Sequence, residues 1–187
     1  MQQSPRAMTF DRSSFAMRVA LIVTGSIVIA LAARLRIDLP FSPVPITLQT
    51  GIVALVGATL GARAGAAAAA LYVVEGLAGA PVFAGGASGL AYALGPTGGF
   101  LVGFIPSAFL AGWLVETGRA RTALTVPLAF AASMLVVYLF GVPWLANVVG
   151  IDRALAAGFI PYLPGDAIKA ISAAALWFAG ARLSRPT

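Results

Sequence analysis

Six long apolar stretches, separated by charged residues and by proline and glycine breaks, limit the folds open to this chain more than any other feature. Hydrophobic residues make up 60% of its 187 residues and charged residues 10%, whereas soluble proteins carry about 25% charged residues. A helix needs about 20 apolar residues to cross the hydrocarbon core of a bilayer. The sequence therefore predicts an all-α integral membrane protein with six transmembrane helices.

The predicted helices fill the chain as a single transmembrane domain over residues 1–187. They lie near residues 16–35, 47–62, 65–80, 98–117, 122–140 and 165–183. The first stretch ends in Ala30-Leu31-Ala32, which resembles a signal-peptidase site. The polar segment before it and the later topology both fit better if this stretch is retained as the first helix.

The basic residues indicate which side each helix end faces. If both termini lie in the cytoplasm (N-in, C-in), eight arginines fall inside, against three arginines and the single lysine on or near the outer side. This bias follows the positive-inside rule. The long connections at residues 36–46, 81–97 and 141–164 then emerge outside, and three helices begin there. Helix N-termini attract anions, so we predict an outward-facing pocket covered by loops.

Composition excludes several classes of function. The chain has no cysteine and no histidine, which removes disulfides, thiolate or imidazole metal sites and the usual general base. It has no G-x-x-x-x-G-K-[ST] motif and hence no P-loop of its own. The arginines are scattered at helix ends rather than gathered in a stripe with aromatic residues, as nucleic-acid binding would require. We expect no metal, no cofactor and no nucleic-acid partner.

Among the charged residues within the apolar stretches, Glu75, Asp166 and Lys169 need an explanation. Lys169, the only lysine, follows Asp166 by three residues, a spacing that places both on one helix face. A charge at the centre of a membrane helix costs about 2.5 to 3.5 kcal/mol, so such residues usually pair or line a polar cavity. The pair indicates a binding site; alternatively, Lys169 reaches the lipid headgroups and Asp166 interacts with its helix N-terminus. For Glu75 we predict a structural ion pair with Arg34, Arg36 or Lys169.

The two outer loops supply further candidates. Three prolines within residues 40–45 stiffen the first loop and force an extended path. The polar residues Thr47, Gln49 and Thr50 follow. One of them can cap the next helix, for which Thr47 is favoured, and another can bind a ligand. The second loop, residues 76–89, is rich in glycine and contains Phe83, so it is either a mobile lid or a plain flexible connection.

Glycines also recur four residues apart within and next to the predicted helices. They occupy positions 57, 61 and 65 and positions 95, 99 and 103. This spacing lets helix backbones approach closely in lipid, so we interpret these glycines as packing residues.

Four motifs, in order, resemble those of the BioY family, the biotin-binding S-components of energy-coupling-factor (ECF) transporters. They are residues 41–50 (FSPVPITLQT), residues 79–86 (GAPVFAGG), residues 94–99 (LGPTGG), and Gly165-Asp166 followed by Lys169. The resemblance extends from Ala16 to about Leu183.

The resemblance implies a six-helix, multi-pass protein of the bacterial or archaeal cytoplasmic membrane, and a transporter subunit rather than an enzyme. Such a protein binds biotin with high affinity from outside and docks on a transmembrane coupling subunit that carries two ATPases. Asp166 and Lys169 match the family's binding site. Ala16 and Ala20 match its small-residue docking motif, in which Arg18 departs from the usual apolar filling.

The chemistry of biotin agrees with these residue types. Its ureido ring offers N–H donors to a carboxylate and a carbonyl to an ammonium, and its valerate is an anion that helix N-termini attract. Aromatic residues can cover its apolar rings. The candidate binding residues are Phe41, Gln49, Phe83, Ser88, Tyr92, Thr97, Asp166 and Lys169.

Two other readings remain open at this point. The chain could be an intramembrane enzyme acting on a lipid or a small anionic substrate, with Asp166 as base and Lys169 as cation, although it lacks histidine and its acidic residues are not clustered. It could also be a structural subunit without a ligand. The sequence does not decide whether it works alone, as a homo-oligomer, or with a dedicated or shared coupling module.

Overall fold

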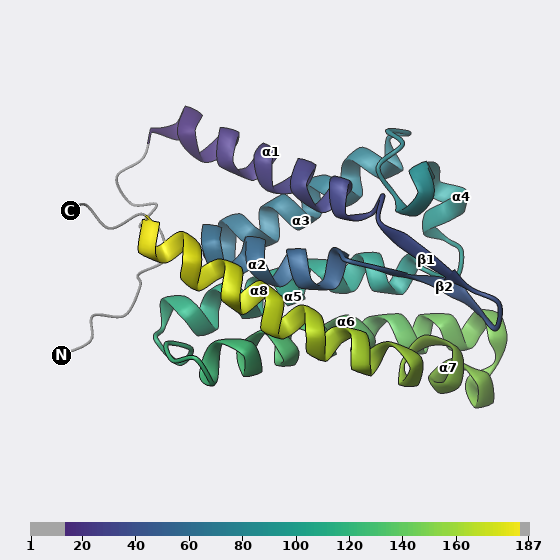
Figure 1. Cartoon of the computed structure of the whole chain (residues 1–187). Helices are drawn as coiled ribbons and strands as arrows, with labels where there is room; N and C mark the ends of the chain where they lie inside the picture. Colours follow the sequence, from purple (N-terminus) through teal and green to yellow (C-terminus); the bar gives the residue numbers. More distant parts are fainter. Residues whose placement is uncertain (1–13, 184–187) are drawn as a thin grey trace.

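Six helices lie side by side and form the body of the protein (Figure 1). The computed structural model describes residues 14–183. Within that range the long helices are α1 (Phe15–Ala32), α2 (Gln49–Leu60), α3 (Ala62–Leu77), α5 (Gly98–Glu116), α6 (Thr125–Val149) and α8 (Leu163–Leu183). Three of them, α1, α5 and α6, are long and apolar enough to cross a membrane. The number of crossings and the N-in, C-in orientation stay predictions.

Several helix boundaries differ from the predicted ones. Helix α6 runs nine residues past position 140, because Gly141 and Pro143 do not end it. Gly141 instead provides the space in which the Phe100 ring packs. Helices α2 and α3 are separated by Gly61 alone, whose φ of 86° turns the chain, so α3 begins at residue 62 rather than 65. Helix α1 ends at residue 32 rather than 35.

The first outer loop corrects the prediction of an all-α fold. It forms an antiparallel hairpin of β1 (Arg36–Leu39) and β2 (Ser42–Thr47), with an irregular register between Ile37 and Leu39. The prolines of this loop force the extended path that was predicted, and the path forms a strand because β1 lies beside it to pair. The fold is therefore mostly helical with a small two-stranded sheet.

The remaining connections contain short helices. They are the 3₁₀ helices η2 (Ala84–Gly86) and η3 (Ile160–Tyr162) and the α-helices α4 (Gly89–Ala93) and α7 (Ile151–Gly158). The hairpin, α4 and α7 gather at one end of the bundle, whereas α1 begins and α8 ends at the other (Figure 1). The chain thus places most of its connecting structure over one end of the helices.

Glycines allow the helices to approach closely. A Cβ added at Gly57 would lie 2.1 Å from the Ala108 carbonyl oxygen of α5, and one at Gly65 would lie 2.5 Å from the Cα of Gly57. One added at Gly103 would lie 2.9 Å from the Cα of Val137 on α6. These contacts confirm the packing role predicted for these three glycines.

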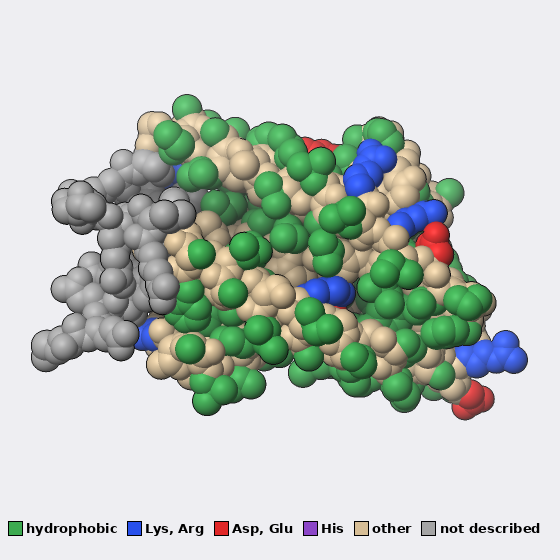
Figure 2. Space-filling view, viewed as in Figure 1, with side chains coloured by type: hydrophobic (Ala, Val, Ile, Leu, Met, Phe, Trp, Pro, Cys, Tyr) green, Lys and Arg blue, Asp and Glu red, His purple; other side chains and the backbone are tan. Residues whose placement is uncertain are grey.

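The outer surface of the bundle is apolar. Leu139, Ile168 and Ile171 are each more than 60% exposed, and hydrophobic side chains cover much of the face shown in Figure 2. Water would penalise such a surface, whereas lipid tails solvate it. The surface agrees with a membrane protein.

The prediction of an ion pair for Glu75 is wrong. Its carboxylate accepts a hydrogen bond from the Ser26 hydroxyl of α1. Among the described residues, the cations proposed as its partners are engaged elsewhere: Arg36 pairs with Asp38, Lys169 pairs with Asp166, and Arg34 donates to the carbonyl of residue 81. A hydroxyl donor satisfies the carboxylate instead and joins α3 to α1.

The packing of Gly57 yields a test of the fold. We expect Gly57→Ala to lower the melting temperature in detergent by the equivalent of about 1 to 3 kcal/mol, because the added methyl group meets the α5 backbone. Gly180→Ala adds the same methyl group to α8 where, among the described residues, no atom beyond its chain neighbours and its own helix backbone lies within 4 Å, and should leave the protein as stable or slightly more so. Equal melting temperatures for the two variants would contradict this packing.

Candidate functional site

The N-terminal ends of α2, α5 and α8 converge on a cavity below the hairpin. The cavity contains about 560 Å³ of empty space, including the part open to solvent. Its polar lining includes Gln49, Thr50, Thr97, Asp166 and Lys169. The predicted meeting of three helix starts under the loops is present in the structure.

Asp166 is the centre of the polar lining and is only 6% exposed. Lys169 Nζ lies 2.9 Å from Asp166 Oδ1, to which the Thr50 hydroxyl also donates at 3.1 Å. The Tyr138 hydroxyl of α6 donates to the other carboxylate oxygen. The carboxylate thus accepts hydrogen bonds from three helices, α2, α6 and α8 itself.

The Lys169 ammonium faces the cavity network rather than lipid headgroups. Its side chain is 10% exposed, and its second contact, at 3.3 Å, is the Thr50 hydroxyl. An ammonium carries three N–H donors, and Asp166 and Thr50 account for two. A third donor is therefore left for whatever fills the cavity.

Thr97, at the start of α5, carries a second unused polar group. Its hydroxyl is buried and has no hydrogen-bond partner among the described residues, although it lies in the cavity wall. Leaving a buried polar group unpaired costs about 1 to 3 kcal/mol. A ligand that reached this hydroxyl would recover that loss.

Gln49 connects the cavity to an aromatic cluster. Its side-chain amide donates to the Tyr72 hydroxyl at 2.8 Å, and its carbonyl accepts from the Thr47 hydroxyl at 3.3 Å. The Tyr72 ring meets Phe83 edge-on, with centroids 5.7 Å apart. Phe83 in turn stacks on Tyr92 at 5.3 Å, so the second outer loop is held by buried rings.

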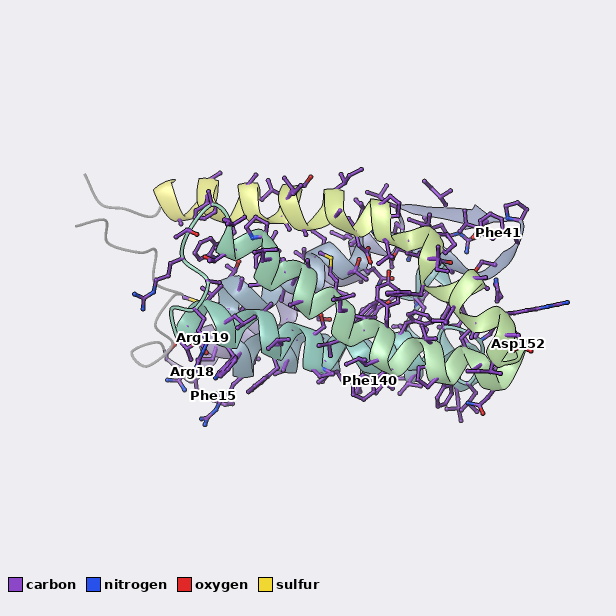
Figure 3. The ribbon with its side chains drawn as sticks, turned by 90° about the horizontal axis from the view of Figure 1, so that it is seen from below. Phe15, Arg18, Phe41, Arg119, Phe140 and Asp152 are labelled. Carbon is purple, nitrogen blue, oxygen red and sulfur yellow. The ribbon has the colours of Figure 1, made fainter. Side chains whose placement is uncertain are left out.

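The structure brings together most of the predicted binding residues but not all of them. Gln49, Tyr92, Thr97, Asp166 and Lys169 line the cavity. Phe83 is fully buried behind the wall rather than in it. Phe41 is 62% exposed at the tip of the hairpin (Figure 3), and Ser88 is half-buried just before α4. Neither of these two lines the cavity.

The predicted docking residues lie far from the cavity. Ala16 and Ala20 are exposed on the first turns of α1. Figure 3 shows the start of this helix, marked by Phe15, at the opposite end of the bundle from Phe41.

Sequence reasoning missed two tyrosines of the site. Tyr138 lies in the middle of α6, 28 residues before the Asp166 carboxylate that it contacts. Tyr162 of η3 donates to the carbonyl of Val44 at 2.5 Å and lies 2.9 Å from the Ser42 hydroxyl. The only available signal was a phenol within an otherwise apolar segment, which does not name its partner.

The Tyr162 phenol stays neutral and serves as a clamp. Burial raises its pKa above the ordinary value, and the hydrogen bond with Ser42 opposes that rise only in part. The protonated hydroxyl therefore keeps donating to strand β2 at neutral pH. This bond holds the hairpin over the start of α8.

The site combines a carboxylate acceptor, an ammonium donor, a hydroxyl and an amide with aromatic walls. Phe100, Phe104 and Tyr92 supply much of the apolar lining. In residues 14–183 no group of three or more acidic side chains could hold a metal ion. The arrangement suits an organic ligand that has both hydrogen-bonding groups and an apolar ring system.

The bundle shares its fold with an S-component of known structure. The crystal structure of "the S-component for biotin from an ECF-type ABC transporter" is similar to this chain, with a TM-score of 0.74 and 25% identity, over 97% of this chain and 96% of that one.

The chain belongs to the BioY family, whose model matches residues 2–185. It is 42% identical over 160 residues to the biotin transporter BioY of Rhizobium etli, covering 81% of this chain and 86% of that protein. It is 38% identical over 138 residues to the probable biotin transporter BioY of Pyrococcus horikoshii, covering 74% and 81%.

The Asp166–Lys169 pair can be tested without a ligand. We expect Lys169→Met to lower stability by about 3 to 5 kcal/mol, because it leaves the Asp166 carboxylate buried without its cation. The double variant Asp166→Asn with Lys169→Met removes both charges and should regain much of that loss. The measurement is a double-mutant cycle of melting temperatures in detergent. Additive effects of the two single changes would show that the pair is not coupled.

Proposed function

We propose that this protein is the substrate-binding subunit of an ECF-type transporter and binds biotin in the cavity between α2, α5 and α8. The observation that carries the proposal is the buried Asp166–Lys169 pair, which lines a cavity in a member of the BioY family. The protein takes up biotin across the cytoplasmic membrane, with the cavity facing outward and both termini inside.

The ureido ring of biotin is the part that complements the charged pair. Asp166 still has acceptor capacity for a ureido N–H, because a carboxylate has about four lone-pair sites and three donors occupy it. The unused Lys169 donor is available to the ureido carbonyl. The valerate carboxylate would be repelled by Asp166, so it is directed away from the pair.

The valerate end fits the start of α5. Helix N-termini carry partial positive charge and free N–H groups, and the Thr97 hydroxyl there has no partner within the described residues. Phe100 and Phe104 lie on the same helix and line the space between the two polar ends. The fused apolar rings of biotin would pack against them.

Active uptake requires partners, because this chain contains no P-loop motif. We place the coupling subunit on α1, where exposed Ala16 and Ala20 lie four residues apart and permit close helix approach. Arg18 does not interrupt this face. At 3.6 residues per turn it points about 200° away from either alanine, and it lines a groove on the other side of α1.

Binding of radiolabelled biotin to the purified protein tests the site. We expect Asp166→Asn and Lys169→Gln each to weaken binding at least roughly thirtyfold, because each removes one member of a buried, hydrogen-bonded pair. Asp152→Asn is the matched control, since Asp152 is exposed on α7 away from the cavity (Figure 3). Wild-type affinity in both site variants would refute the assignment, and the absence of binding by the unaltered protein would refute the function.

Co-purification with a coupling subunit tests the docking face. We expect Ala20→Trp to bind biotin normally but to fail to co-purify with the coupling subunit and to support no ATP-dependent uptake, because the indole holds a partner helix away. Ala175→Trp makes the same change at an exposed position of α8 and should leave assembly intact. Normal uptake by Ala20→Trp would return Ala16 and Ala20 to an ordinary lipid-facing role.

A further inference from the structure

A second hollow lies at the other end of the bundle from the biotin cavity. It is a groove between α1 and α5, and residues at the junction of α2 and α3 also line it. The groove contains about 1,050 Å³ of empty space, including its open side. Ile22, Leu60, Phe109 and Trp113 form its apolar wall. The site described above uses none of these residues.

Basic side chains surround this groove. Arg18 and Arg63 line it, and neither forms an ion pair or a side-chain hydrogen bond within residues 14–183. The Arg119 guanidinium lies 4.3 Å from the centroid of the Trp113 ring, and Figure 3 shows Arg18 and Arg119 at the same end of the bundle. Glu116 is the single acidic side chain that residues 14–183 contribute to the lining. The groove therefore combines excess positive charge with an apolar wall.

We propose that this groove binds one anionic phospholipid, with its phosphate held by Arg18 and Arg63 and an acyl chain along Ile22, Leu60 and Phe109. Basic pockets between transmembrane helices are suited to anionic headgroups, and a tryptophan belongs at the level of the headgroups. Free phosphate would use the arginines but leave the apolar wall uncovered. A partner helix is better served by the small residues on the opposite side of α1.

The site has a consequence for the helices that form it. Helix α1 packs on α2 and α3, and the groove separates it from α5. A lipid bound there would place its phosphate charge between the two arginines and fill the space between α1 and α5. The proposal rests on the groove and holds whether or not biotin is the ligand of the other cavity.

Lipid binding to the purified protein tests the charged half of the site. Native mass spectrometry in detergent should detect one bound dioleoylphosphatidylglycerol and little dioleoylphosphatidylcholine. We expect the double variant Arg18→Gln with Arg63→Gln to bind phosphatidylglycerol roughly thirtyfold more weakly. Each arginine near an anionic headgroup contributes about 1 kcal/mol of binding free energy, and the loss of two such contributions corresponds to this factor. Arg153→Gln, at an exposed position of α7, removes a cation at the far end and should change nothing.

A second variant tests the apolar half. Ala64 lines the groove, and Ala64→Trp would fill it without changing its charge, so it too should weaken phosphatidylglycerol binding. A melting temperature in detergent close to that of the unaltered protein reports that each variant is folded. Equal binding of both lipids, an equal effect of Arg153→Gln, displacement by inorganic phosphate, or no effect of Ala64→Trp would each overturn the proposal. So would variants that keep the lipid but lose the coupling subunit, since the groove would then be a protein contact.

Discussion

The ion pair between Asp166 and Lys169 is the interaction on which the organisation of the site depends. Taking two charges out of water is expensive, and their mutual attraction offsets the cost only when further hydrogen bonds satisfy both groups. Here Thr50 of α2 and Tyr138 of α6 provide those bonds to a carboxylate on α8. The same bonds therefore specify how three helices meet, because a shift of any one of them would leave a buried polar group unpaired.

Much of the helical framework is predictable because membrane helices can be recognised in a sequence by their length and hydropathy. The starts of α2, α5 and α8 fall within two residues of their predicted positions. Their position at one end of the bundle was expected because every second helix of such a chain begins on the same side. The end of α6 was not predictable in the same way. A proline usually breaks or kinks a helix, but α6 continues through Pro143, and Gly141 accommodates the Phe100 ring. Packing between residues far apart in the sequence thus outweighs the helix-breaking tendency of a local glycine or proline, and a short sequence segment does not reveal such packing.

The site shows the same division between local and long-range information. The spacing of Asp166 and Lys169 places them together on one helix, so the sequence alone identifies them as partners. Tyr138 and the Ser26 donor of Glu75 come from other helices, and their contacts depend on helix rotation, which apolar periodicity leaves undefined in a bundle surrounded by lipid. Phe41 and Phe83 have similar chemistry, yet one is at an exposed turn and the other is fully buried, because the hairpin projects beyond the bundle while the second loop folds back on it.

The clamp made by Tyr162 links the cover of the cavity to its floor. Its hydroxyl holds Val44 and Ser42 of the hairpin, and the residue itself stands four positions, about one helical turn, before Asp166. While these bonds last, the hairpin cannot lift without pulling on the segment from which α8 begins. Movement of the hairpin and displacement of the carboxylate are thus mechanically coupled, and the bound hairpin helps to keep the charged pair in place.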